Sequence, residues 1–300
     1  MLRSNRIWVG LHRVSSFACF AAFLLLLSIG CDSPSKAPTA DKGAAAREKT
    51  APPNTTTPDP SEQAPAVVKE APTESSPQSA AAVAGNGGGV KVSGRVVLQG
   101  TPPVRRLVNT TKDAMCAGLH ADKKLLDEDL LVSSSGGVKN AFVRVHRGAP
   151  KQDYPLPEKP AVLNQQGCMF HPRVLGVRVG QRLLIDNGDP MTHNVRTFTT
   201  ANAPFNFGQP PDSAPRERVF DRAEREIEVA CDFHPWMHAY VFVMEHPFFS
   251  VSADDGAYVI DGLPPGEYLL ETWHEKLGKQ RKTVTVGGED LVDVNFSLAR

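Results

Sequence analysis

Residues 225–238 read REIEVACDFHPWMH and begin with a regular alternation of side chains. Up to the cysteine, apolar and charged side chains alternate, which places Ile227, Val229 and Cys231 on one face. Because successive side chains of a strand point to opposite faces, this alternation predicts a β-strand. The strand runs directly into CDFHPWMH, where a thiol, two imidazoles and a thioether follow one another closely. So many nitrogen and sulfur donors at the end of a strand predict a metal site.

The period-two pattern recurs from Val90 to the C-terminus and is broken by turn sequences such as DNGDP (186–190) and GLPPG (262–266). Short strands separated by Gly, Pro and Asp are typical of β-sandwiches and barrels. The nearest candidate for a helix is ADKKLLDEDLLV (121–132), which also suits a short strand with a charged turn. The predicted fold class is therefore all-β.

The N-terminal part of the chain has a different composition. Residues 1–30 carry arginines but no acid and end in the apolar run FACFAAFLLLLSIG, which is too short for a comfortable membrane span and predicts a signal peptide. The run leads into Cys31 and resembles the bacterial lipobox, although Ser28 stands where that motif prefers leucine. Residues 31–89 are rich in Ala, Pro, Ser and Thr and lack aromatics, so they predict a disordered tether. We expect an exported protein, lipid-anchored through Cys31 to a bacterial membrane in the periplasm or cell envelope. A signal peptide cut elsewhere and an uncleaved anchor are the alternatives.

The charge balance and the cysteine content limit the partners and the metal-ligating residues that the chain can be expected to have. The chain has 33 basic and 33 acidic residues, and this balance gives no reason to expect a nucleic-acid partner. Of its five cysteines, three fall in the predicted mature domain: Cys116, Cys168 and Cys231. An odd number of thiols in an oxidising compartment leaves at least one without a disulfide partner. The economical assignment pairs Cys116 with Cys168 and leaves Cys231 as a metal thiolate.

The spacing of donors around Cys231 favours copper. Cys-x2-His-x2-Met allows a tight loop to direct Cys231, His234 and Met237 toward one point. A thioether is a poor ligand for zinc and a good one for copper, and two imidazoles, a thiolate and a weak axial methionine form the blue-copper set. The second imidazole is expected from His193, which opens the strand after DNGDPMT. The alternative is tetrahedral zinc with His238 in place of the methionine.

From about residue 162 to residue 245 the chain resembles the cupredoxins, and its ligand loop is similar to that of amicyanin. The resemblance is carried by CMFHPRVLGVRVGQ (168–181), by the dipeptide His193-Asn194 and by CDFHPWMHAYVFV (231–243). It implies a Greek-key sandwich with one type 1 copper ion. The ligands implied by the resemblance are His193, Cys231, His234 and Met237.

The same resemblance assigns roles to neighbouring residues. It implies that Asn194 hydrogen-bonds backbone near the ligand loop and that Trp236 and His238 lie next to the ligands. In the family the histidine of the Cys–Met loop is the more exposed ligand, so His234 is the expected entry point for electrons.

The function implied is electron transfer and not enzymatic catalysis. We expect a membrane-tethered carrier of single electrons, whose partner is a redox protein such as a cytochrome or a membrane oxidase or reductase. Two alternatives are a copper-binding or copper-delivery protein and an extracellular binding module with a structural metal, copper or zinc.

A second resemblance lies near the C-terminus. DGAYVIDGLPPGEY (255–268) resembles the carboxypeptidase regulatory-like, or transthyretin-like, β-sandwich. Those modules begin with strands similar to VKVSGRVVLQGTPP (90–103) and VKNAFVRVHRG (138–148). We therefore expect residues 90–156 with 247–300 to form this sandwich and residues 157–246 to form an inserted cupredoxin domain. Two sequential domains divided near His246 are the alternative.

Overall fold

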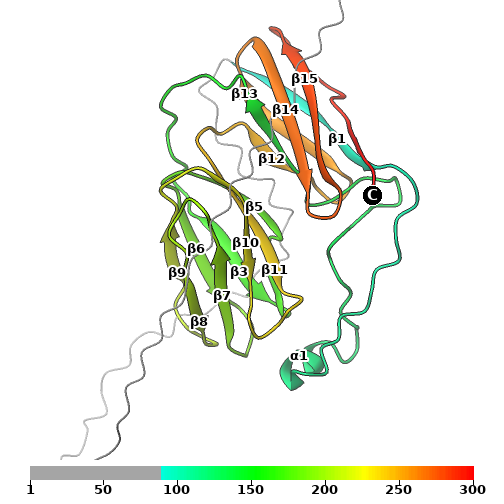
Figure 1. The fold of residues 1–300 in the computed structure, drawn as a ribbon, viewed down its shortest axis with the longest axis vertical. Coiled ribbons are helices and arrows are strands. Elements are labelled where there is room, and N and C mark those ends of the chain that lie inside the picture. The colour runs from blue at the N-terminus through cyan, green and yellow to red at the C-terminus, as the bar shows by residue number, and fades with distance from the viewer. Residues whose placement is uncertain (1–88) are drawn as a thin grey trace, which may run out of the picture. The chain divides into compact units, whose positions relative to one another are not determined.

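The computed structural model describes residues 89–300, which contain 16 strands and one short helix that lies between the first two strands (Figure 1). The all-β prediction is confirmed. The expected signal peptide, Cys31 and all but the last residue of the expected tether lie outside the described residues. Within residues 89–300, no helix has the length and apolar character that a membrane span requires.

The one described helix does not lie at the expected candidate. Helix α1 is Ala114–Leu119, with Asp113 as its N-cap, while residues 121–132 form only isolated β-bridges such as Leu107 with Leu126. Charged residues interrupt the apolar pairs in 121–132, so no continuous face is available for a helix to bury.

The first sandwich is formed by seven strands from both ends of the described chain. One sheet has the order β13-β1-β16 and the other β12-β2-β14-β15. Their bounds are β1 (Val90–Leu98), β2 (Phe142–Arg147), β12 (Phe249–Val251), β13 (Ala257–Leu263), β14 (Gly266–His274), β15 (Gly278–Val286) and β16 (Phe296–Leu298).

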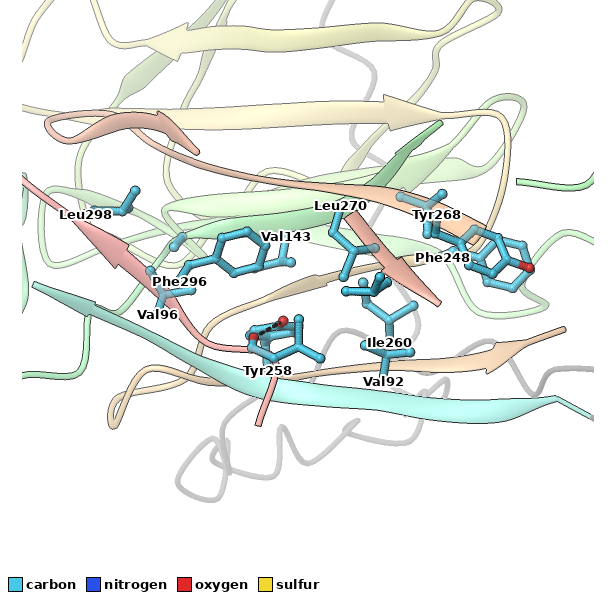
Figure 2. Packing of buried hydrophobic residues seen from close by; sticks show 14 of the residues in the cluster. Val92, Val96, Val143, Phe248, Tyr258, Ile260, Tyr268, Leu270, Phe296 and Leu298 are labelled. Carbon is cyan, nitrogen blue, oxygen red and sulfur yellow. Dashed lines mark hydrogen bonds between the residues drawn. The ribbon is translucent and has the colours of Figure 1, made fainter. Parts of the chain in front are cut away.

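Apolar side chains from both sheets fill the space between them (Figure 2). Val92 of β1, Ile260 of β13 and Leu270 of β14 are fully buried, as is Phe296 of β16. Burying one such side chain contributes about 1.5–3 kcal/mol. This core combines residues of β1 and β2 with residues of β12 to β16, so the first sandwich is complete only when both parts of the chain are present.

The second sandwich is formed by the middle of the chain. Its sheets have the orders β5-β11-β10-β7-β8 and β4-β3-β6-β9. Their bounds are β3 (Ala161–Gln166), β4 (Met169–His171), β5 (Val174–Arg178), β6 (Arg182–Asn187), β7 (His193–Phe198), β8 (Asn206–Gln209), β9 (Arg216–Val219), β10 (Glu224–Ala230) and β11 (His238–Met244). All nine strands fall between β2 and β12 in the chain.

Aromatic and charged contacts join strands of the two sandwiches. Phe142 of β2 stacks on Phe242 of β11 with ring centroids 3.9 Å apart, and Trp273 of β14 packs edge-on against Phe242. Arg173, just before β5, donates to Glu275 Oε2 at 2.9 Å and to Asp129 Oδ1 at 2.8 Å. Asp129 belongs to the long connection between β1 and β2, residues 99–141, which we call the β1–β2 segment. The same segment contains α1 and is joined to the second sandwich by the disulfide between Cys116 and Cys168.

Candidate metal centre

The loop between β10 and β11 places two of the expected ligands, Cys231 and Met237, in the core. The Cys231 N–H donates to the Met237 carbonyl at 3.2 Å, and the Met237 N–H donates to the His234 carbonyl at 2.9 Å. These bonds close the loop into a tight turn between β10 and β11. Cys231 and Met237 consequently both pack in the core of the second sandwich.

Three of the four expected ligands meet at one point. His193 opens β7, the strand beside β10, and its Nδ1 lies 2.9 Å from His234 Nδ1. The Cys231 Sγ lies 3.5 Å from the same His234 Nδ1, and one donor atom from each residue falls within 4.8 Å of the others. Nitrogen and sulfur atoms bound at roughly 2.0–2.3 Å from one metal ion lie roughly 3–4 Å from each other. The donor spacing therefore fits a single ion.

The four expected ligands are shielded from water. Their exposed fractions are 0% for His193, 3% for Cys231, 1% for His234 and 0% for Met237. A buried thiolate among imidazoles and a buried thioether is the donor set that selects copper.

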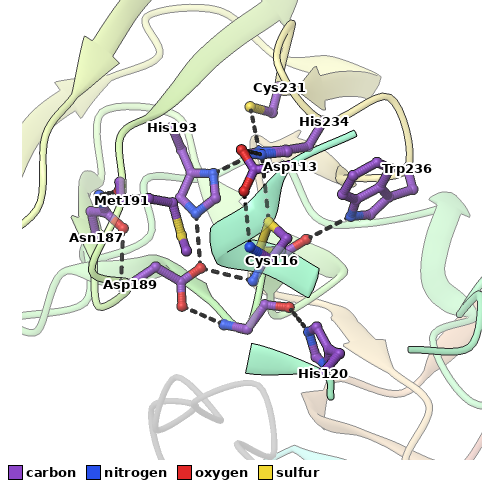
Figure 3. The surroundings of a disulfide bond; sticks show 12 residues. Asp113, Cys116, His120, Asn187, Asp189, Met191, His193, Cys231, His234 and Trp236 are labelled. Atoms are coloured by element: carbon purple, nitrogen blue, oxygen red, sulfur yellow. Dashed lines mark hydrogen bonds and ion pairs between the residues drawn. A yellow bond between two sulfur atoms is a disulfide. The ribbon is translucent and has the colours of Figure 1, made fainter. Parts of the chain in front are cut away.

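Each imidazole is held by a carboxylate on its other nitrogen (Figure 3). His193 Nε2 donates to Asp189 Oδ2 at 2.8 Å, and His234 Nε2 donates to Asp113 Oδ2 at 3.2 Å. With both Nε2 atoms protonated, neutral imidazoles direct two Nδ1 lone pairs at each other across 2.9 Å. Two facing lone pairs repel unless a cation lies between them, so the arrangement fits a metal ion or a shared proton.

The same contacts displace the pKa values of the donors. Burial raises the pKa of the Cys231 thiol, but hydrogen bonds with His193 and His234 outweigh burial and lower it to about 6. Burial lowers the pKa of His193, but its interactions with Asp189 and Cys231 together outweigh burial and raise the pKa to about 9. The pKa of His234 is likewise raised, because bonds to Cys231 and Asp113 outweigh its burial. The protein thus stabilises a thiolate, the form that binds metal.

Asn194 ties β7 to the ligand loop. Its backbone N–H donates to Cys231 Sγ at 3.5 Å, and its side-chain Nδ2 donates to Asp232 Oδ2 at 3.0 Å. Its Oδ1 accepts the backbone N–H of Asp232. The structure therefore gives Asn194 the contacts to the loop backbone that the family resemblance implied.

A disulfide lies against the ligand histidine. Cys116 and Cys168 are joined, with Cα atoms 6.0 Å apart, and Cys116 Sγ is 3.5 Å from His234 Nε2. Trp236 Nε1 donates to the Cys168 carbonyl at 3.1 Å, and its ring centroid lies 5.2 Å from that of His234. Cys231 is the free cysteine of residues 89–300.

The expectation that His234 is an exposed entry point is wrong. Asp113, Cys116 and Trp236 cover its imidazole, leaving 1% of the residue accessible. The covering groups from the β1–β2 segment lie outside the stretch that resembles cupredoxins. The exposed residues of the ligand loop are instead Asp232, Phe233 and Pro235.

His238 does not join the cluster. Its Nδ1 bonds Glu228 Oε1 at 2.9 Å and its Nε2 donates to the Pro235 carbonyl. The metal-competent group around Cys231 contains His193 and His234 without it. The zinc set that needs His238 is thus not assembled in this structure.

Sequence reasoning missed the two carboxylates. Asp189 stands four residues before His193 in the DNGDP turn, a spacing that could have marked it as a partner. Asp113 lies 121 residues before His234, and only its position three residues before Cys116 offers a signal. Once Cys116 is paired with Cys168, Asp113 must lie near the metal end of the sandwich.

No family model matches the chain, and no curated protein is similar enough to match it. Its neighbours among solved structures are cupredoxins. A copper-containing nitrite reductase from Thermus scotoductus SA-01 is 20% identical with a TM-score of 0.28, over 34% of this chain and 26% of that one. The chain thus spans about a quarter of that nitrite reductase.

Two smaller neighbours are covered almost entirely. A purple cupredoxin from Nitrosopumilus maritimus is 22% identical with a TM-score of 0.24, over 28% of this chain and 99% of that one. Amicyanin from Paracoccus versutus is 21% identical with a TM-score of 0.26, over 34% of this chain and 97% of that one. Similarity at this level does not establish a shared activity, so the functional conclusion rests on the geometry of the site.

Proposed function

We propose that this chain is an exported electron carrier with one mononuclear type 1 copper site formed by His193, Cys231, His234 and Met237. The observation that carries the proposal is the pair of buried imidazoles whose Nδ1 atoms face each other at 2.9 Å beside the Cys231 thiolate. Such a donor set suits a copper ion that gains and loses a single electron.

The contacts of the ligands support electron transfer over metal delivery. Asp189, Asp113 and the Asn194 N–H hold the imidazoles and the sulfur through bonds that do not involve the metal. Ligands held in this way have little freedom to rearrange when the charge at the site changes. Handing a metal to another protein requires ligand exchange, which the burial of all four donors disfavours.

Phe233 is the proposed place of contact with a redox partner. It follows Cys231 by two residues and is 59% exposed, while both ligand imidazoles are covered. A partner that docks on the ligand loop would therefore meet Phe233 together with Asp232 and Pro235. We propose a cytochrome or a membrane oxidase or reductase as the class of partner.

Export and lipid anchoring through Cys31 form part of the proposal. The bond between Cys116 and Cys168 supports an oxidising compartment, because structural disulfides are rare in reducing ones. We further propose that the first sandwich is a non-catalytic module of the carboxypeptidase regulatory-like type, which supports the copper domain inserted in it.

The test is the absorption and electron paramagnetic resonance (EPR) spectrum of the full chain loaded with Cu(II). We expect intense visible absorption from the thiolate and a small copper hyperfine splitting, both lost in Cys231→Ser. His238→Gln is the matched control and should keep both signals, because His238 bonds Glu228 and Pro235 instead. A colourless wild type with one tightly bound zinc, or loss of the signals in His238→Gln, would refute the copper assignment.

A further inference from the structure

Two carboxylates and a disulfide form one continuous support around the ligand histidines (Figure 3). Asp113 accepts the Cys116 N–H at 2.9 Å on one oxygen and the His234 Nε2–H at 3.2 Å on the other. Asp189 Oδ2 accepts the Cys168 N–H at 2.7 Å and the His193 Nε2–H at 2.8 Å. Each carboxylate therefore binds one half of the disulfide and one ligand imidazole.

We propose that Asp113 and Asp189 are positioning residues of the metal site and that the Cys116–Cys168 bond holds Asp113 against His234. The inference rests on the proposed copper function. It goes beyond that function by assigning part of the site to the β1–β2 segment, which lies outside the inserted sandwich.

Asp189 is held by the inserted sandwich itself. It lies in the connection between β6 and β7, its side chain is 4% exposed, and its second oxygen accepts the Gly167 N–H at 2.6 Å. Three N–H donors thus fix one carboxylate, so its position does not depend on the β1–β2 segment.

Asp113 depends on the disulfide. Its side chain is 34% exposed, and α1 spans only six residues, of which Cys116 alone is buried. A helix this short is not stable by its own hydrogen bonds. Met115 and Leu119 of α1 are about half exposed, so little apolar burial holds the helix in place. Two ties therefore keep Asp113 on the imidazole: the covalent bond to Cys168, and a hydrogen bond of 2.9 Å from His120, the C-cap of α1, to the Gly167 carbonyl.

The carboxylates act on the ligands in two ways. Accepting the Nε2–H fixes the tautomer and ring orientation, so that the Nδ1 lone pair points into the site, and makes the imidazole a better donor. Each carboxylate also places a negative charge beside the site. Negative charge stabilises the more highly charged cupric form over the cuprous form. Removing it should shift the balance toward Cu(I).

The test compares Asp113→Asn, Asp113→Ala and Asp122→Asn in the full chain. Asparagine is as good an N-cap as aspartate, so Asp113→Asn removes the charge while keeping α1 capped. Asp122→Asn is the matched control, because it removes a charge from the same segment at an exposed residue for which the described structure shows no bond to either imidazole.

We expect Asp113→Ala to weaken copper binding by about 10–100-fold. We expect Asp113→Asn to raise the reduction potential, by about 59 mV for each tenfold change in the Cu(I) to Cu(II) affinity ratio. Asp122→Asn should change neither quantity. Asp113 variants that match Asp122→Asn in affinity, potential and EPR spectrum would overturn the proposal.

The role of the disulfide is tested by a double-mutant cycle. Replacing Cys116 and Cys168 together by serine should lower copper affinity as Asp113→Ala does, and adding Asp113→Ala in that background should have little further effect. Fully additive effects would show that the bond does not act through Asp113. If wild type lacks the thiolate–copper spectrum, the proposed function fails; if wild type shows it and no Asp113 variant alters the site, this inference alone fails.

Discussion

Removing the disulfide should destabilise the protein and expand its denatured state. The change is Cys116→Ser with Cys168→Ser, and it opens a covalent loop with a sequence separation of 52 residues. For a loop of that size the chain-entropy relation gives about 14 cal/mol/K, or about 4 kcal/mol at 25 °C. Part of this loss is offset, because the β1–β2 segment also gains freedom in the native state once α1 is released. The expected decrease in the free energy of unfolding is therefore about 2–4 kcal/mol.

Urea unfolding of the metal-free full chain measures this effect. Removing a cross-link from the denatured chain exposes more surface, so the slope m should rise while the midpoint falls. Cys231→Ser is the control, since it replaces a cysteine and leaves the bond between Cys116 and Cys168 intact. An unchanged or smaller m, together with a loss of less than about 1 kcal/mol, would refute the loop-entropy reasoning.

Three further changes test other parts of the fold. Burial raises the pKa of Glu224, but hydrogen bonds from Thr200 and Asn202 outweigh burial and lower the pKa from 4.5 to about 2. The ionised side chain therefore stabilises the folded protein by about 3 kcal/mol above pH 4.5, and this contribution is lost as the pH falls toward 2. Glu224→Gln should therefore be less stable at pH 7 and lose less stability on acidification, as measured by urea midpoints; parallel pH curves would contradict this. Burial lowers the pKa of His274 from 6.5 to about 4, so protonating this side chain should contribute about 3 kcal/mol to the loss of stability as pH falls from 6.5 to 4. His274→Gln should therefore lose less stability than the wild type over this range, and equal losses would count against the assignment. Phe242→Ala should lower the free energy of unfolding by about 3–5 kcal/mol, because the Phe242 ring is buried against Phe142 and Trp273. Phe198→Ala, at a half-exposed ring, should lower it far less in the same thermal or urea unfolding experiment. Equal losses would exclude tight packing at the Phe242 contact.

The features that could be predicted from the sequence are local in the chain. Alternation of side chains predicts the strands because one face of each is buried, as Ile227 and Val229 are in β10. The spacing of Cys231, His234 and Met237 predicts a tight loop because three donors with two residues between them fit one turn. Cysteine counting led to the pairing of Cys116 with Cys168 that the structure shows.

The features that were missed depend on contacts between distant segments. Whether His234 is exposed depends on what covers it, and the covering carboxylate of Asp113 comes from a stretch with no resemblance to the copper-binding family. The short helix α1 is a further example. It begins at the Asp113 cap and is held by the bond of Cys116 to Cys168, while its own apolar side chains stay half exposed, so no helical period marks it in the sequence.

The order of the strands gives these long-range contacts a common cause, because β3 to β11 of the second sandwich lie between β2 and β12 of the first. The β1–β2 segment connects two strands of the first sandwich, yet its Asp113 contacts His234 of the second sandwich. This contact requires the two sandwiches to be held in one relative position. Arg173 links the two sandwiches. It lies just before β5 of the second sandwich, and its buried guanidinium binds Asp129 of the segment and Glu275 of the first sandwich. The desolvation of such a buried ion network offsets much of its attraction, so the network is not expected to add much stability. Arg173 thus restrains the segment at its Asp129 end and the disulfide restrains it at Cys116, and the position of Asp113 on His234 follows from both.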